Sequence, residues 1–309
     1  MFEDTSEAQG LRVIRAGVHS TIQDLGRYGY AGHGLSQGGP MDLQAHCWVN
    51  RLLNNIASDA TIEITVGMAS FRAECDLVLA LGGADLQAEL DSELIGNWRS
   101  FVIKRGQTLK LQPARKGLRA YLGIKGGVQT ESMMGSCSTV VRNGLGSAIV
   151  DGDLLSAASH HAHIDAHVPP RYLPSYPETI TLRVIESYQA RNFSPQALKV
   201  FYQSEYELSA DSNRMGARLE GESIDSPNEG IISEGIALGS IQVPSDGQPI
   251  VLLNDRQTLG GYPKLGVVAR VDLPQLGQAR PGTKVRFSPI ALSQARREWC
   301  QFCDYFSGV

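Results

Sequence analysis

Residues 250–264 read Ile-Val-Leu-Leu-Asn-Asp-Arg-Gln-Thr-Leu-Gly-Gly-Tyr-Pro-Lys, a short apolar segment that stops at a run of polar side chains and then at a glycine pair. The apolar part, Ile250–Leu253, has the length of a strand and is too short for a helix. Similar short segments recur along a chain that is punctuated by 33 glycines and 14 prolines. Many short strands with glycine turns favour barrels or sandwiches over a doubly wound fold.

The remaining expected elements follow from the same patterns. Strands are predicted at Leu11–Ile14, Thr61–Val66, Leu77–Ala80, Thr108–Leu111, Leu118–Ile124, Thr181–Ile185, Ile241–Val243, Val267–Val271 and Lys284–Phe287. Two helices are predicted, from Pro40 to Asn54 and from Ala291 to Phe306. Their apolar stripes are expected to be core contacts: Met41, Ala45, Trp48, Val49 and Leu52 in the first, and Leu292, Ala295, Trp299, Phe302 and Phe306 in the second. We therefore expect an all-β protein with a few helices.

The composition is that of a soluble globular protein, with 42% hydrophobic and 19% charged residues. A net charge of −4 and the absence of a Lys/Arg run argue against a nucleic-acid partner. No apolar run approaches the ~18 residues of a membrane span, and the N-terminus lacks the apolar region of a signal peptide. Five scattered cysteines suit a reducing compartment. We expect a cytoplasmic protein with no membrane partner.

The chain is long enough for two domains. A polar, Pro-rich stretch predicts a linker at 166–177, between an N-terminal domain (1–165) and a C-terminal domain (178–309) that ends in a helix. Around the start of this linker lie four histidines and an aspartate: His160, His161, His163, Asp165 and His167. A metal site is conceivable there, but a polar connector fixes no coordination geometry, and we predict no metal.

The polar run after Leu253 predicts a ligand site, because a rigid strand that ends in polar groups presents them to a ligand. The glycine pair Gly260-Gly261 allows close approach of the backbone. The alternative is a polar hairpin held by its own Asp–Arg pair.

Three other motifs are weaker. The loop Gly277–Lys284 resembles a phosphate loop, but its Thr precedes its Lys and a strand follows, so a plain turn is expected. Gly34–Gly38 matches the G-x-S-x-G nucleophile elbow without the buried strand that must precede it, so a serine hydrolase is a minor alternative. Cys300 and Cys303 lack a second pair for zinc, and a buried thiol is expected at Cys303.

Five separated blocks in one order carry a resemblance to a known family. They are Thr21–Tyr30, Gly34–Asp42, Ile62–Ile64, Met134–Thr139 and Ser212–Gly216, in addition to the block quoted above. The chain resembles the family of the second allophanate hydrolase subunit, also called the biotin-dependent carboxyltransferase or KipI antagonist family, one branch of which belongs to the ATP-dependent 5-oxoprolinases. Ala217 and Leu259 depart from the family pattern, where an aromatic residue and a threonine are usual.

The resemblance implies two tandem cyclophilin-like β-barrel domains and a role in a complex that opens 5-oxoproline to glutamate with ATP hydrolysis. It implies ATP with Mg²⁺, bound with or by a partner. The implied partners are the A and B subunits of 5-oxoprolinase, which are lactam-utilisation-type and KipI-like proteins. Two alternatives remain: the carboxyltransferase lobe of a urea carboxylase, for which biotin would be the cofactor, and a non-enzymatic regulator that binds a KipI-like partner.

Phosphorylation and hydrolysis of a lactam need cations near the developing charge and a carboxylate to move protons. The catalytic candidates are Asp255, as proton carrier, and Arg214, Arg256 and Lys264, as cations. The substrate-binding candidates are Asn213, Gln242, Gln248, Asn254, Gln257, Thr258, Gly260, Gly261 and Tyr262. Asp24, Arg27, Ser36 and Asp42 are polar anchors of a glycine-rich loop expected to fold over a ligand or partner; an Asp–Arg clasp within that loop is the alternative.

Overall fold

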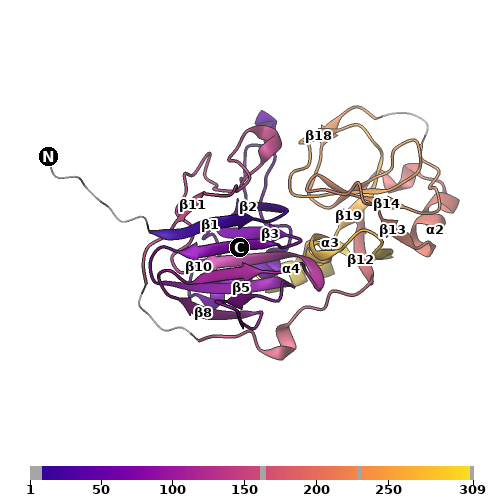
Figure 1. Cartoon of the computed structure of the whole chain (residues 1–309). Helices are drawn as coiled ribbons and strands as arrows, with labels where there is room; N and C mark the ends of the chain where they lie inside the picture. Colours follow the sequence, from indigo (N-terminus) through magenta and orange to yellow (C-terminus); the bar gives the residue numbers. More distant parts are fainter. Residues whose placement is uncertain (1–8, 161–164, 228–230, 307–309) are drawn as a thin grey trace. The chain divides into compact units, whose positions relative to one another are not determined.

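The computed structural model describes residues 9–160, 165–227 and 231–306, which fall into two compact units (Figure 1). The first unit consists of the chain up to Gly26 and of Leu43–Pro174, and the second of Arg27–Asp42 and the chain from Ser175. The crossing at Pro174 lies inside the segment predicted as a linker. The sequence predicts Arg27–Asp42 in the first domain, whereas the structure gives this segment to the second unit.

The first unit is built from two antiparallel sheets (Figure 1, indigo to magenta). The six-stranded sheet has the order β11 (Leu154–Ser156), β1 (Gly10–Ala16), β4 (Ala69–Ala73), β9 (Thr108–Leu111), β6 (Glu89–Leu90) and β7 (Glu93–Leu94). The five-stranded sheet has the order β2 (His19–Gln23), β3 (Thr61–Thr65), β10 (Lys116–Ile124), β5 (Leu77–Asp85) and β8 (Arg99–Ile103). Aliphatic and aromatic side chains of both sheets, among them Leu11, Phe71 and Leu122, share one buried core.

Helix α1 (Leu43–Leu52) packs on β5 and β10, and Ala45, Trp48, Val49 and Leu52 of the predicted stripe are buried as expected. Met41 precedes the helix and is buried in the core of the second unit instead. The close approach depends on glycine: a Cβ atom at Gly123 would lie 2.4 Å from Val49 Cγ1. The helix begins at Leu43, later than the predicted Pro40. It also buries His46, whose ring nitrogens lie 2.9 Å from Thr61 Oγ1 and 2.8 Å from the carbonyl oxygen of Ala57. Burial lowers the pKa of His46, so this ring is neutral at pH 7.

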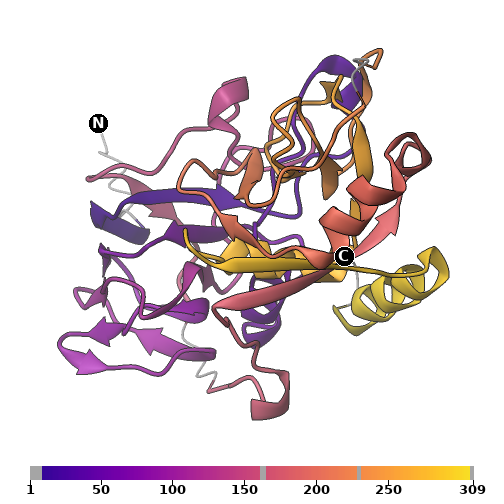
Figure 2. The same cartoon turned by 90° about the vertical axis from the view of Figure 1, so that its right-hand side faces the viewer.

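The second unit is a closed barrel of seven strands. Its order is β12 (Thr179–Glu186), β19 (Lys264–Val268), β16 (Ser240–Gln242), β17 (Ile250–Leu252), β14 (Gly216–Glu220), β13 (Tyr206–Leu208) and β20 (Lys284–Pro289). Only β12 and β20 run parallel among these pairs, and Figure 2 shows them side by side. A small ribbon pairs β15 (Glu234–Gly235) with β18 (Leu259–Gly260), and a hydrogen bond from the amide of Ile236 to the carbonyl oxygen of Thr258 extends it.

Three helices belong to the second unit: α2 (Pro195–Gln203), α3 (Leu273–Gln278) and α4 (Leu292–Phe306). Sequence reasoning missed α2, although Ser194 caps it by accepting a 3.0 Å hydrogen bond from the amide of Ala197 and Pro195 opens its first turn. In α4, which projects beyond the barrel in Figure 2, only Ala295 of the predicted stripe is buried. The expectation of a core stripe is wrong for the rest of α4. Leu292 is exposed, and Trp299 and Phe302 stack on each other along a half-buried face.

The predicted all-β class with a few helices is confirmed. The second unit is a closed barrel, and the strands of the first unit form two sheets. The strand predicted at Val267–Val271 is wrong in position: β19 ends at Val268, and Arg270–Asp272 form a short 3-10 helix, η5, that leads into α3. No helix in the described residues combines the length and the apolar character needed to cross a bilayer.

Candidate functional site

A buried ion pair lies at the end of β17. Both carboxylate oxygens of Asp255 accept hydrogen bonds from Arg214, at 2.8 Å from Nε and 3.0 Å from Nη2. Each side chain is 11% exposed. The guanidinium also donates to the carbonyl oxygen of Gly39, at 2.8 Å. This bidentate pair has the geometry that arginine and carboxylate favour, and it leaves Asp255 poorly placed to accept a substrate proton.

The segment Arg27–Asp42 is fastened to the same strand end. Asn254 Nδ2 donates to the carbonyl oxygens of Gly38 (3.2 Å) and Pro40 (3.1 Å). Ser36 Oγ donates to the carbonyl oxygens of Asp255 (3.2 Å) and Arg256 (2.7 Å). We call Asn254, Asp255, Arg214 and Ser36 the clamp. Arg214 and Asp255 pair with each other, and the other two side chains bind backbone carbonyl oxygens, so Ser36 is a structural hydroxyl here and not the nucleophile of an elbow.

A second polar cluster surrounds Lys264 at the start of β19. Lys264 Nζ forms an ion pair with Glu234, and Tyr188 Oη donates to the same carboxylate. Gln189 Nε2 donates to Glu234 Oε1 at 2.6 Å, and its Oε1 accepts from the amide of Lys264 at 2.8 Å. Lys264 is buried, whereas the Glu234 side chain is 34% exposed. We call these four residues the Lys264 cluster.

Charge and hydrogen bonding fix the ionisation of Glu234. The hydrogen bond from Lys264, followed by that from Tyr188, holds the pKa of Glu234 below its usual value. The cluster therefore combines a buried cation with an ionised carboxylate that is partly open to solvent.

Gln242 lies beside Lys264 across the β16–β19 ladder. Its Nε2 atom is buried and has no hydrogen-bond partner among the residues that the structure describes. A Cβ atom at Gly260 would lie 2.7 Å from this nitrogen, so β18 passes over the amide only because residue 260 is glycine. Buried amide donors without partners are rare and call for an explanation, such as a ligand carbonyl or a water.

The clamp and the Lys264 cluster occupy opposite ends of the β16–β17 pair. Gln242 pairs with Ile250 at the start of β17, whereas the clamp follows Leu252 at its end. The charged candidates therefore do not gather in one place. Arg214 is the partner of Asp255, and Glu234 is the partner of Lys264. The single polar strand end predicted from the sequence is two sites, joined by residues 256–263.

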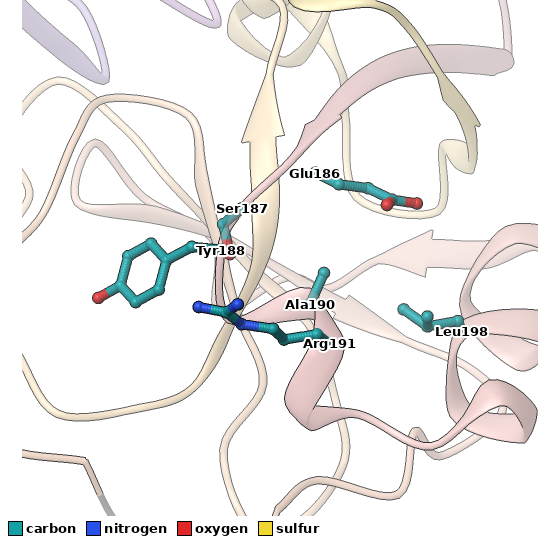
Figure 3. A pocket seen from close by; sticks show the side chains of 6 residues that line it. All are labelled: Glu186, Ser187, Tyr188, Ala190, Arg191 and Leu198. Carbon is teal, nitrogen blue, oxygen red and sulfur yellow. The ribbon is translucent and has the colours of Figure 1, made fainter.

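A pocket of about 310 Å³ opens beside the Lys264 cluster (Figure 3). It is lined by Glu186, Ser187, Tyr188, Ala190, Arg191 and Leu198. Figure 3 shows the Arg191 guanidinium extending toward the side on which Tyr188 lies, and Glu186 and Leu198 on the other side. The volume is at the lower end of small-ligand sites, and the lining offers a cation, a carboxylate and an apolar wall.

Arg256 differs from the other two cationic candidates. Its Nε donates to the carbonyl oxygen of Ile236 (3.1 Å) and its Nη1 to that of Leu253 (3.3 Å). Burial, and then the positive charge of Arg270, lowers the pKa of Arg256 to about 10, so it remains a cation at pH 7.

Several predicted residues make hydrogen bonds outside the two clusters. Gln248 precedes β17 and braces Gly221, with 2.8 Å from the glycine amide to its Oε1. Asn213 Oδ1 accepts from the amide of Met215 in its own turn, at 2.8 Å. Asp42 accepts hydrogen bonds from Gln278 (2.8 Å) and Tyr176 (3.3 Å). These three side chains stabilise turns and loops instead of forming a ligand site.

Other predicted residues lie in the loop of residues 256–263 that joins the two clusters. Gln257 is exposed, Tyr262 is 51% exposed, and Thr258 is joined through its carbonyl oxygen to the amide of Ile236. The carbonyl oxygen of Gly261 accepts from the amide of Ile231. In the N-terminal loop, the amide of Arg27 donates to the carbonyl oxygen of Gln37. This bond closes the loop on itself, and the bonds from Asn254 hold it at the end of β17.

Asp24 belongs to the first unit. It accepts hydrogen bonds from Ser136 Oγ (2.5 Å), Ser138 Oγ (2.6 Å) and the amides of Cys137 (2.6 Å) and Gly26 (2.9 Å). Burial alone raises the pKa of Asp24, but these hydrogen bonds outweigh it, so the pKa lies below its usual value. Asp24 joins two of the recognised sequence blocks and is a structural anchor.

Sequence reasoning missed Tyr188, Gln189, Arg191 and Glu234. The first three follow the predicted strand Thr181–Ile185 in the run Glu186-Ser-Tyr-Gln-Ala-Arg191. Polar residues directly after an apolar strand also pointed to Asn254. The same pattern predicts Tyr188, Gln189 and Arg191 as site residues. Glu234 follows a polar loop without such a pattern, and its role depends on pairing with Lys264 from a distant part of the sequence.

The structure shows no candidate metal centre among the described residues. His161 and His163 lie outside those residues, and Asp165 pairs with Arg99 at 2.7 Å. Cys303 is half-buried and not fully buried as predicted, and burial raises the pKa of its thiol. The Gly277–Lys284 segment ends in a turn that leads into β20, as expected.

Comparisons with known proteins agree with this architecture. The family model of the carboxyltransferase domain, subdomain A and B, matches residues 33–289. The C subunit of 5-oxoprolinase from Escherichia coli (strain K12) is 34% identical over 291 residues, which are 92% of this chain and 93% of that protein.

Two solved structures are similar over nearly the whole chain. The crystal structure of TTHA0988 has a TM-score of 0.84 and 32% identity over 91% of this chain, which spans 55% of that one. Urea amidolyase of Kluyveromyces lactis has a TM-score of 0.88 and 25% identity over 97% of this chain, which spans 20% of that one. The chain thus covers about half of the first structure and a fifth of the second. It belongs to the family of the carboxyltransferase domain, subdomains A and B, together with the C subunit of the Escherichia coli 5-oxoprolinase.

Proposed function

We propose that this chain is the C subunit of an ATP-dependent 5-oxoprolinase, which opens 5-oxo-L-proline to L-glutamate as ATP is hydrolysed. The observation that carries the proposal is the match to a relative of that name, at 34% identity over 92% of this chain and 93% of the relative. Because the match covers both chains almost completely, it favours the same role for the two proteins over the presence of one common domain in proteins of different function.

The substrate fits the pocket beside the Lys264 cluster. 5-Oxoproline carries one carboxylate and one lactam, and Arg191 provides a cation in the wall of the pocket. Arg191 forms no ion pair with any residue that the structure describes, so its charge is available for the substrate carboxylate. Tyr188 lines the pocket and belongs to the Lys264 cluster, so a bound ring lies next to Glu234.

An unstrained lactam resists hydrolysis, and ATP supplies the activation by transferring its γ-phosphoryl group to the lactam oxygen as ADP leaves. Water then adds to the ring carbon, the C–N bond breaks as the nitrogen takes a proton, and a second water hydrolyses the acyl phosphate to glutamate and phosphate. In this proposal Lys264 stabilises negative charge at that oxygen, and Glu234 moves the proton of the attacking water. The Gln242 amide is the donor for the lactam oxygen, because it is buried without a partner in the described part of the chain. Asp255 and Arg214 position the loop at the other end of the strand pair.

The complete site needs partners. The sequence contains no credible nucleotide loop, so ATP and Mg²⁺ are bound with or by the A and B subunits, of the lactam-utilisation and KipI-like types. The chain alone is therefore proposed to be inactive.

A second candidate is the carboxyltransferase lobe of a urea carboxylase. It is favoured by the similarity to urea amidolyase of K. lactis, with a TM-score of 0.88. There the same pocket would face carboxybiotin and urea. A regulator that binds a KipI-like partner without catalysis is the third.

The discriminating experiment uses this chain co-expressed with its two proposed partners. Glutamate release from 5-oxoproline with ATP is expected, and carboxylation of urea in the presence of a biotin carboxylase is not. Urea carboxylation without glutamate release would replace the proposal with the second candidate, and the absence of both activities from a stable complex would favour the regulator.

A further inference from the structure

The side chain of Gln189 joins the strand that carries Lys264 to the ribbon that carries Glu234. Gln189 follows β12 and precedes a short 3-10 helix, η4 (Ala190–Asn192). The residue is only 4% exposed. A buried side-chain amide has to find partners for both its oxygen and its nitrogen, so the partners of Gln189 indicate what it does.

The backbone that carries this side chain is fixed to β19. The amide of Ser187 donates to the carbonyl oxygen of Leu265 at 3.0 Å, and Ser187 Oγ donates to that of Lys264 at 2.6 Å. The same hydroxyl accepts a hydrogen bond from the amide of Gln189 at 3.1 Å. These hydrogen bonds hold the start of the Gln189 side chain in place.

The side-chain amide of Gln189 has partners at both ends. Its Oε1 accepts from the amide of Lys264 at 2.8 Å. Its Nε2 donates to Glu234 Oε1 at 2.6 Å and to Tyr188 Oη at 2.9 Å. Only the nitrogen can donate to a carboxylate, and only the oxygen can accept from a backbone N–H, so these partners allow one orientation of the amide.

Glu234 receives hydrogen bonds from two segments of the barrel. Lys264, at the start of β19, forms an ion pair with it, and Tyr188 and Gln189, which follow β12, both donate to it. Tyr188 donates to Oε2, whereas Gln189 donates to Oε1. Because Gln189 Nε2 also donates to the Tyr188 hydroxyl, one nitrogen holds both the phenol and the carboxylate.

We infer that Gln189 is a positioning residue, which fixes the Glu234 carboxylate and the Tyr188 hydroxyl relative to Lys264. Tyr188 lines the pocket and Gln189 does not, so Gln189 acts through its neighbours. A proton carrier has to be held within hydrogen-bond reach of its target, and a rigid supporting contact provides this. The effect on catalysis rests on the proposed function, whereas the effect on Glu234 itself does not.

The test is the titration of the Glu234 carboxylate in the full chain, followed by ¹³C NMR, with Glu234→Gln to assign the signal. Gln189→Met is similar in size but donates no hydrogen bond to the ionised carboxylate, so it should raise the pKa of Glu234. Gln189→Glu keeps an acceptor for the Lys264 amide and sets a second negative charge beside Glu234. It should therefore raise this pKa as well.

Gln278→Glu is the matched control. Gln278 is another buried glutamine of the second unit, and its Nε2 donates to Asp42 Oδ2 at 2.8 Å. The substitution likewise sets two carboxylates against each other, so it shows what general destabilisation does. The titration of Glu234 should be the same in this variant as in the wild type.

In the assembled complex, Gln189→Met should lower kcat by about tenfold or more, the usual scale for a hydrogen bond to a charged group. The acid limb of the pH–rate profile should move to higher pH, because Glu234 then ionises at higher pH. KM should change little, since Arg191 in the pocket wall is kept.

A pKa of Glu234 that is equal in the wild type, Gln189→Met and Gln189→Glu would overturn the inference. A fall in kcat without a move of the acid limb would also overturn it, since a merely structural role gives that result. Raised pKa values in both variants, together with a wild-type complex that releases no glutamate, would support the positioning role and refute the proposed function.

Discussion

At the level of single residues, the groups that surround each candidate cation of the second unit indicate what that cation can do. Arg214 pairs with Asp255 and Lys264 with Glu234, whereas Arg256 donates to the carbonyl oxygens of Ile236 and Leu253. The three candidate cations therefore have different surroundings: Arg214 holds a loop, Lys264 is proposed to stabilise charge on the lactam oxygen, and Arg256 supports two backbone carbonyls.

Replacing Lys264 by Gln should lower the turnover of the assembled enzyme by at least ~10²-fold, because the cation next to the reacting oxygen is lost. The measurement is steady-state glutamate release by the complex. Lys284→Gln serves as control, since Lys284 pairs with Glu207 on an exposed strand. Equal turnover in the two variants would take Lys264 out of the mechanism.

Asp255→Asn should act on stability first. Arg214 would keep its charge in a site where both side chains are 11% exposed, which costs about 3 kcal/mol. Urea unfolding measures this loss, and turnover per folded molecule should remain within about tenfold of wild type. A well-folded variant with a ~10²-fold loss of turnover would instead assign proton transfer to Asp255.

The Asp24 carboxylate should make the free energy of unfolding depend on pH. Its folded-state pKa is lowered, so the stability it contributes is present above its ordinary pKa and is lost as the pH falls through the folded value. Asp24→Asn should unfold more easily than wild type at pH 7, by about 1–3 kcal/mol. The difference should shrink below about pH 4. Urea unfolding over a pH series checks this, and a pH-independent difference would contradict it.

At the level of elements, apolar periodicity predicted the strands and helices whose apolar side chains pack against a core. β9 has the predicted bounds, and the stripe of α1 is buried because it faces a sheet. The α4 pattern is as regular, yet Trp299 lies against Arg270. Spacing alone cannot distinguish a helix face that meets a core from one that meets a guanidinium.

The contact of α1 with its sheet can be tested at Gly123. Gly123→Ala would place Cβ 2.4 Å from Val49 Cγ1, an overpacking that costs about 1–3 kcal/mol of unfolding free energy. Gly32→Ala should be nearly neutral, since a Cβ atom there meets nothing within 4 Å. Thermal melting compares the two, and similar melting temperatures would mean that the helix can shift away from β10.

At the level of the full chain, the division into units was the feature hardest to predict from the sequence. The Arg27–Asp42 segment has no composition that assigns it to either unit. Its place is decided by hydrogen bonds from Asn254 and Ser36, which join residues more than two hundred positions apart in sequence. Polar runs in the sequence indicated that polar side chains lie at strand ends. They could not show which cation pairs with which carboxylate, because the partners are far apart in the sequence.

The purified chain should form a stable complex with the KipI-like partner. Its own residues provide a pocket and a cation–carboxylate pair but no recognised nucleotide loop. Size-exclusion chromatography of co-expressed proteins is the measurement. Separate elution at micromolar concentration would speak against a composite enzyme.

Reconstitution by omission tests whether this chain is a necessary part of a 5-oxoprolinase. Glutamate release from 5-oxoproline with ATP and Mg²⁺ is measured for the three-protein mixture, for the mixture without this chain, and for this chain alone. Glutamate is expected from the complete mixture only. Glutamate formed without this chain, or by this chain alone, would contradict the proposed function, as would a complete and stable complex that forms none.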